Sequence, residues 1–128
     1  MKPKVVKADS LKEYFTPEGC FIYQNWGLAS EGDKKVSIAR ARVEPGVTTK
    51  VHHLKGIQEI YLITNGIGKV QIGTLEPEKV TEGDVIIIPP NASQLIANIG
   101  KTDLIFYCVC TPAFTQDRYV DEEAKTVP

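Results

Sequence analysis

The chain has 128 residues, the usual size of one domain, and its 42% hydrophobic and 24% charged residues exclude a disordered or fibrous protein. A single domain over residues 1–128 is therefore expected. The net charge is -1, and no basic cluster is longer than Lys34-Lys35, so a nucleic-acid partner is not expected. The longest strongly apolar run, Val85 to Ile88, is far shorter than the roughly 20 residues that a membrane-spanning helix needs, so no membrane span is expected.

Short runs rich in Val, Ile, Tyr and Phe alternate with Gly, Pro and Asn along the chain, which is typical of an all-β sandwich or barrel. A helical turn capped by Ser10 is expected to run through Phe15, and a second helical segment is expected at residues 115–123. The strands expected between them are 20–26, 35–43, 48–53, 58–64, 68–72, 85–88, 94–98 and 103–110.

The dipeptide Asn65-Gly66 predicts a tight β-hairpin between strands 58–64 and 68–72, because such turns need the positive φ angles that Asn and Gly tolerate. In the first of these strands Tyr61 and Ile63 lie on one face, and Ile60 and Leu62 lie on the other. Since both faces are apolar, either a second sheet or a partner subunit is expected to cover the second face.

The three cysteines, Cys20, Cys108 and Cys110, are odd in number and follow an N-terminus without a secretory signal. They are therefore expected to be reduced thiols in a cytoplasmic protein. Cys108 and Cys110 share one strand face and are interpreted as small core residues, with pocket-lining thiols as the alternative.

Two spaced patterns carry the functional signal. Gly46 is followed by five residues, His52-His53-Leu54, four residues, Glu59, six residues and Gly66. Gly83 is followed by five residues, Pro89-Pro90-Asn91, two residues, Gln94, three residues and Asn98. Residues 46–66 resemble the first cupin motif, G(x)5HxH(x)3-4E(x)6G, and residues 83–98 resemble the second, G(x)5PxG(x)2H(x)3N. Three identities depart from these motifs: Leu54 and Gln94 replace histidines, and Asn91 replaces a glycine.

The resemblance implies a cupin-type small β-barrel, a jelly-roll-like double-stranded β-helix with short helical segments at the termini. In cupins with the full pattern, three imidazoles and one carboxylate hold a divalent metal inside the barrel. The resemblance here implies a reduced metal site of His52, Glu59 and the carbonyl oxygen of Gln94, for Mn²⁺, Fe²⁺, Ni²⁺ or Zn²⁺. Burying Glu59 without a cation or a hydrogen-bond partner would be costly.

Four neighbouring residues have alternative interpretations. Tyr61 lies on the same strand face as Glu59 and either donates its hydroxyl to a ligand or is a core aromatic residue. His53 is expected on the face opposite His52. Arg40 and Arg42 share a face, and they either point into a cavity that takes a carboxylate or phosphate or form salt bridges at an oligomer contact.

Three functions stay open at this point. The first is a metal-dependent cupin enzyme, an isomerase, dioxygenase or decarboxylase, acting on a small polar molecule such as a sugar or carboxylic acid. The second is a metal-free sugar isomerase or epimerase in which His52 removes a proton and Tyr61 returns one, although no second carboxylate that orients His52 is identifiable. The third is a non-catalytic barrel that binds a small ligand. A homodimer is expected in each case.

Overall fold

The structure is a computed structural model that describes residues 2–28 and 33–123. Within this part of the chain, short 3-10 helices lie near both ends and the regular structure between them is β. The elements are η1 (Ala8–Ser10), β1 (Tyr14–Phe15), β2 (Phe21–Trp26), β3 (Ser37–Val43), β4 (His52–Leu54), β5 (Gln58–Asn65), β6 (Ile67–Ile72), β7 (Glu78–Thr81), β8 (Val85–Ile88), β9 (Gln94–Asn98), β10 (Leu104–Thr111), η3 (Gln116–Arg118) and β11 (Tyr119–Asp121).

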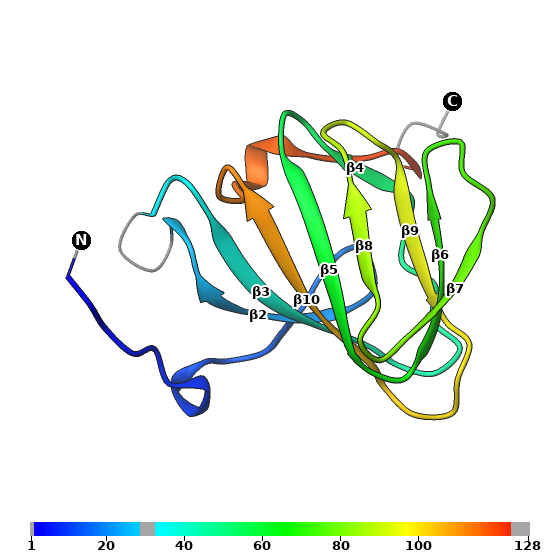
Figure 1. The fold of residues 1–128 in the computed structure, drawn as a ribbon, viewed down its shortest axis with the longest axis horizontal. Helices are drawn as coiled ribbons and strands as arrows, with labels where there is room; N and C mark the ends of the chain where they lie inside the picture. The colour runs from blue at the N-terminus through cyan, green and yellow to red at the C-terminus, as the bar shows by residue number, and fades with distance from the viewer. Residues whose placement is uncertain (1, 29–32, 124–128) are drawn as a thin grey trace.

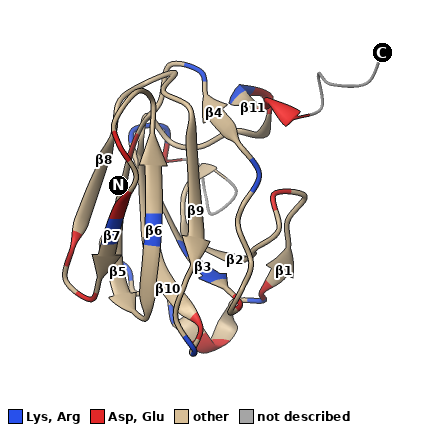
Figure 2. Cartoon of the chain, turned by 90° about the vertical axis from the view of Figure 1, so that its right-hand side faces the viewer, with Lys and Arg blue, Asp and Glu red and all other residues tan. Residues whose placement is uncertain are grey.

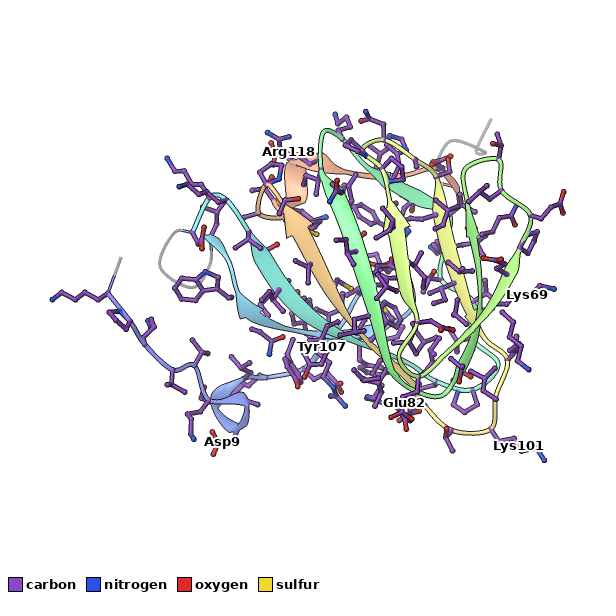
Figure 3. All side chains as sticks on the ribbon, in the orientation of Figure 1. Asp9, Lys69, Glu82, Lys101, Tyr107 and Arg118 are labelled. Atoms are coloured by element: carbon purple, nitrogen blue, oxygen red, sulfur yellow. The ribbon has the colours of Figure 1, made fainter. Side chains whose placement is uncertain are left out.

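The strands form two antiparallel sheets that face each other (Figure 1). The six-stranded sheet has the order β1-β2-β3-β10-β5-β8, and the five-stranded sheet has the order β11-β4-β9-β6-β7. Side chains from both sheets fill the space between them (Figure 3). This arrangement confirms the all-β, cupin-type fold that the sequence predicts.

The core follows from strand alternation. In β3 and β10 every second residue is buried, because successive side chains of a strand point to opposite faces. The inner faces of both sheets meet in one cluster of buried apolar side chains. Its largest members are Val43, Tyr61, Ile63, Val70, Ile72, Val80, Ile86, Ile88, Ile96, Leu104 and Phe106.

The predicted hairpin at Asn65-Gly66 is wrong. The chain turns there, but β5 pairs with β10 and β8, whereas β6 pairs with β7 and β9, so the turn passes the chain from one sheet to the other. Gly66 has φ +90, and a Cβ built on it would lie 2.7 Å from the carbonyl oxygen of Asp103. A glycine is therefore needed at this corner for conformation and for space, and a local sequence signal does not distinguish the corner from a hairpin.

The two ends also differ from the predicted helices. Ser10 lies inside η1, and its hydroxyl donates to the carbonyl oxygen of Lys7, while Tyr14 and Phe15 form β1. In 115–123 the helix is limited to η3, and the chain then pairs with β4 as β11. Among the residues described, no helix has the length and apolar character required to cross a membrane.

Candidate functional site

A cavity of about 180 Å³ opens between the two sheets. Its inner wall includes His52, Glu59, Tyr61, Cys108 and Cys110, whose side chains are buried. Exposed residues of the segment 14–17 and exposed Gln116 also line it, so these mark its mouth. The cavity is smaller than the sites that hold drug-sized ligands, so it suits a small molecule.

His52 lies on the inward face of β4 and is held by its neighbours in a defined protonation pattern. Its Nδ1 lies 2.8 Å from the carbonyl oxygen of Lys50, and since a carbonyl oxygen only accepts, Nδ1 carries a hydrogen. Its Nε2 lies 3.4 Å from Oε2 of Glu18. Because Nδ1 faces the backbone, Nε2 is the ring nitrogen that faces the carboxyl group of Glu18. The ring also stacks on Tyr119, with centroids 5.1 Å apart.

Glu18 is the site residue that sequence reasoning missed. It lies in the turn between β1 and β2, where its carbonyl oxygen accepts a hydrogen bond of 3.0 Å from the backbone N–H of Lys50. Burial raises the pKa of the Glu18 carboxyl, and the nearby His52 partly offsets this rise. No motif marks Glu18; the available signal was an acidic residue in a turn with Pro17 and Gly19, a pattern that is common on protein surfaces.

Glu59 enters the same cavity from β5 in the opposite sheet. Its Oε2 is 3.6 Å from the Sγ of Cys110, its Oε1 is buried, and a side-chain hydrogen bond from Gln94 opposes the effect of burial on its pKa. Burial is the main cause that raises the pKa of Glu59 to about 7, and the charge of Glu18 adds to the rise. Glu59 is thus set to exchange a proton near neutral pH.

Tyr61, which lines the cavity, forms a polar contact with Gln94. The Tyr61 hydroxyl donates to Oε1 of Gln94, and the buried side-chain amide of Gln94 also interacts with the carboxyl group of Glu59. Burial raises the pKa of Tyr61 well above its usual value, so the hydroxyl stays protonated. Gln94 pairs with His52 in the sheet register, yet Tyr61 lines the cavity and Gln94 does not.

The side chains present do not fit a resident divalent metal as they stand. The carbonyl oxygen of Gln94, the atom able to ligate, already accepts from Tyr61, and Nε2 of His52 faces Glu18. In residues 2–28 and 33–123 no group of three His, Cys, Asp or Glu side chains is placed to hold a metal ion. The set of His52, Glu59 and Gln94 stays a prediction, and no reaction step is derived through it.

The remaining candidates lie on the outside. His53 points away from His52, as the strand pleat predicts, and its Nδ1 is 2.9 Å from Oε2 of Glu122. Arg40 and Arg42 also lie outside the cavity, on the outer face of β3. Arg42 binds Glu13 at 2.6 Å and Asp103 at 3.4 Å, both within the chain, so these arginines do not point into the cavity, and an oligomer contact at this place stays a prediction.

The three thiols are part of the cavity lining. Burial raises the pKa of Cys20 to about 12 and raises those of Cys108 and Cys110 as well. All three are free cysteines and remain protonated at neutral pH. They are therefore poor nucleophiles and serve as neutral walls of the cavity.

Comparison with known proteins agrees with this architecture. A family model described as a cupin domain matches residues 39–110, and the chain therefore belongs to the cupin family. It is 34% identical over 118 residues to the uncharacterized protein MJ1618 of Methanocaldococcus jannaschii, covering 89% of this chain and 92% of that protein.

Several solved structures share the fold. A predicted oxalate decarboxylase from Thermotoga maritima has a TM-score of 0.70 at 24% identity, covering 85% of this chain and 99% of that one. A Streptomyces PAC13 variant with uridine has a TM-score of 0.76 at 15% identity, covering 94% and 90%. Oxalate decarboxylase from Bacillus subtilis has a TM-score of 0.79 at 16% identity, covering 94% of this chain and 32% of that one.

Proposed function

We propose that this cupin is an enzyme that isomerises a small, uncharged carbonyl compound, such as the open-chain form of a sugar, by proton transfer. The observation that carries the proposal is the contact between His52 and Glu18, in one cavity with the buried carboxyl group of Glu59 from the opposite sheet. A base and an acid that reach a substrate from two sides are the minimum for moving a proton between carbon atoms.

The proposed step balances within the site. Glu59 removes the proton from the carbon next to the carbonyl group while the imidazolium of His52 donates a proton to the carbonyl oxygen, which gives an enediol. Return of a proton from Glu59 to the neighbouring carbon, with transfer of the other hydroxyl proton to His52, yields the isomer. Glu18 stabilises the charged imidazole, and the hydroxyl oxygen of Tyr61 remains able to accept a hydrogen bond from substrate.

The cavity lining supports an uncharged substrate. Two carboxyl groups, those of Glu18 and Glu59, face the cavity, and none of the described residues that line it is Lys or Arg. An anionic substrate would be repelled by the Glu59 carboxylate there, and the proposed imidazolium of His52 is already paired with Glu18. The aromatic rings of the lining, including Phe106 and Tyr119, offer flat apolar surfaces to a sugar ring or chain. That a PAC13 structure carries uridine, an uncharged polar ligand, supports this class of compound for the fold.

The test is deuterium exchange on a panel of neutral aldoses and ketoses, with small carboxylic acids as the competing class. The protein is incubated with each compound in D₂O, and loss of the proton next to the carbonyl is followed by NMR. We expect exchange with at least one sugar, and we expect Glu59→Gln to abolish it. Glu78→Gln, which changes an exposed glutamate of β7, is the matched control and should leave exchange intact.

Two outcomes would reject the proposal. Exchange that is confined to the carboxylic acids would exclude the uncharged substrate class. Saturable binding of sugars without any exchange would favour the non-catalytic ligand-binding barrel.

A further inference from the structure

A second cavity, of about 350 Å³, adjoins the mouth of the first, and we call it the outer pocket. Its lining includes Tyr14, Gln24, Ser37, Phe114, Thr115 and Gln116. All of these residues except Thr115 also line the inner cavity that holds His52 and Glu59, so the two spaces are continuous. The volume of the outer pocket reaches the lower end of the range that holds drug-sized ligands, which the inner cavity alone does not.

Small side chains on the inner face of β3 leave space between the outer pocket and the inner cavity. The register places Ser37 of β3 beside Cys110 of β10, and Cys110 beside Glu59 of β5. In the next inward row Gln24 of β2 lies beside Ala39. Strands are about 4.8 Å apart, so a ligand that extends from Glu59 past Ser37 spans roughly 10 Å. This span is longer than one sugar unit and suits two joined units.

The outer pocket offers uncharged groups to a ligand. None of the described residues that line it is Lys, Arg, His, Asp or Glu. β1 and β2, which bring Tyr14 and Gln24 to it, consist of uncharged residues and are drawn in tan in Figure 2. A charged ligand group would find no partner of opposite charge among these residues, whereas hydroxyl groups would find hydrogen-bond partners.

The amides of Gln24 and Gln116 suit hydroxyl groups in particular, because a glutamine side chain both donates and accepts hydrogen bonds. Nε2 of Gln24 donates to the Tyr14 hydroxyl at 3.2 Å, a bond that uses one of the two hydrogens of the amide. Gln116 is exposed and begins η3. The rings of Tyr14 and Phe114 add flat apolar surface. A sugar ring matches this lining, since it combines an apolar face with a rim of hydroxyl groups.

We propose that the outer pocket binds a second, uncharged sugar unit, so that the substrate is a disaccharide whose reducing unit occupies the inner cavity. This inference rests on the proposed function, in which the carbonyl end of the sugar reaches His52 and Glu59. It assigns Gln24 and Gln116 as the residues that determine specificity for the second unit. A nucleoside, which joins a sugar to a flat uncharged ring, is the competing ligand and enters the test.

The experiment compares the affinity of the full chain for glucose, for uridine, and for maltose, cellobiose and lactose, which each carry glucose at the reducing end. Calorimetric titration gives each Kd without requiring turnover. We expect at least one disaccharide to bind at least about tenfold more tightly than glucose. The double variant Gln24→Ala/Gln116→Ala removes both amides and should reduce this preference to less than about threefold. Circular dichroism checks that the variant is folded.

The matched control is Gln58→Ala/Gln71→Ala, the same change at two exposed glutamines outside both cavities. The control should keep the preference for the disaccharide. NMR of ¹⁵N-labelled glutamine side chains provides a second measurement. The preferred disaccharide should shift the amide signals of Gln24 and Gln116 more than glucose does, and it should leave those of Gln58 and Gln71 in place.

Three results would overturn the proposal: no measurable binding of any sugar, disaccharides that bind no better than glucose or uridine, and a preference that survives Gln24→Ala/Gln116→Ala. Failure of the proposed function is distinguishable from these. A disaccharide preference without deuterium exchange would reject the isomerase and support the ligand of the outer pocket. Exchange on glucose without a disaccharide preference would support the isomerase and reject the second sugar unit.

Discussion

Oε2 of Glu18 lies 3.4 Å from Nε2 of His52, a contact that joins the turn between β1 and β2 to the first motif strand. The sequence motifs identify His52 but no carboxylate beside it, and Glu18 is that carboxylate in the structure. Because Nδ1 of the same ring contacts the backbone carbonyl oxygen of Lys50, the ring is oriented with Nε2 towards Glu18.

Replacing His52 with Asn should remove proton donation while keeping a polar side chain on β4. We expect turnover of the substrate found by deuterium exchange to fall by about 10²- to 10⁴-fold, the usual share of general acid–base catalysis. The neighbouring His53→Asn is the matched control, because His53 lies outside the cavity and contacts Glu122. Steady-state kinetics checks the pair, and equal losses in both variants would contradict the assignment.

Glu18→Gln should lower the pKa of Glu59 from its value of about 7, because the negative charge of Glu18 is one of the causes that raise it. The side-chain carboxyl signals of labelled glutamate, followed by ¹³C NMR through a pH titration, give this value directly. Glu44→Gln removes a similar charge at an exposed site and should leave the Glu59 titration unchanged. An unchanged Glu59 pKa in Glu18→Gln would mean that the two carboxyl groups do not interact.

Stability should fall as pH rises through the acidic range. The pKa of Glu59 is raised from 4.5 to about 7, so between these values the folded state holds a proton that the unfolded state has lost. The free energy of unfolding therefore decreases from pH 4.5 to pH 7, by up to roughly 3 kcal/mol for this group. Glu59→Gln should flatten this slope and stabilise the protein at pH 8. Urea unfolding at pH 5 and pH 8 measures both, and a wild type that gains stability over this range relative to Glu59→Gln would contradict the expectation.

Activity in the deuterium-exchange assay should survive prolonged dialysis against EDTA. The carbonyl oxygen of Gln94 is occupied by Tyr61 and Nε2 of His52 by Glu18, so both contacts would have to break before these residues bind an ion. Elemental analysis before and after dialysis accompanies the assay. If activity is lost and is then restored by adding Mn²⁺, Fe²⁺, Ni²⁺ or Zn²⁺, the result would support a metal-dependent enzyme instead.

The spacing of the two motifs was enough to predict the fold, because several motif positions are occupied by residues that the backbone conformation of the fold requires. Asn91 stands at the glycine position of the second motif and adopts the left-handed φ of +69 that Asn tolerates, with its Oδ1 accepting from the backbone N–H of Gly56. Asn98 also acts through the backbone, since its Nδ2 donates to the carbonyl oxygens of Val43 and Thr102 at 2.8 Å.

The site was harder to predict because part of it depends on contacts between distant segments. Glu18 has no motif partner, and β1, which precedes its turn, is only two exposed residues long, too short for an alternation pattern. The motif spacing also placed the Gln94 carbonyl oxygen among the metal ligands. Spacing alone does not reveal that the Tyr61 hydroxyl donates a hydrogen bond to this oxygen.

The bond from Tyr61 to Gln94 has a consequence for how this barrel can change. It links β5 of one sheet to β9 of the other and holds the side-chain oxygen of Gln94. A single replacement of Gln94 by histidine would remove the oxygen that accepts from the Tyr61 hydroxyl and leave that buried hydroxyl without this partner. Converting this barrel into a metal-holding one therefore requires a new partner for the Tyr61 hydroxyl as well as a new ligand at position 94.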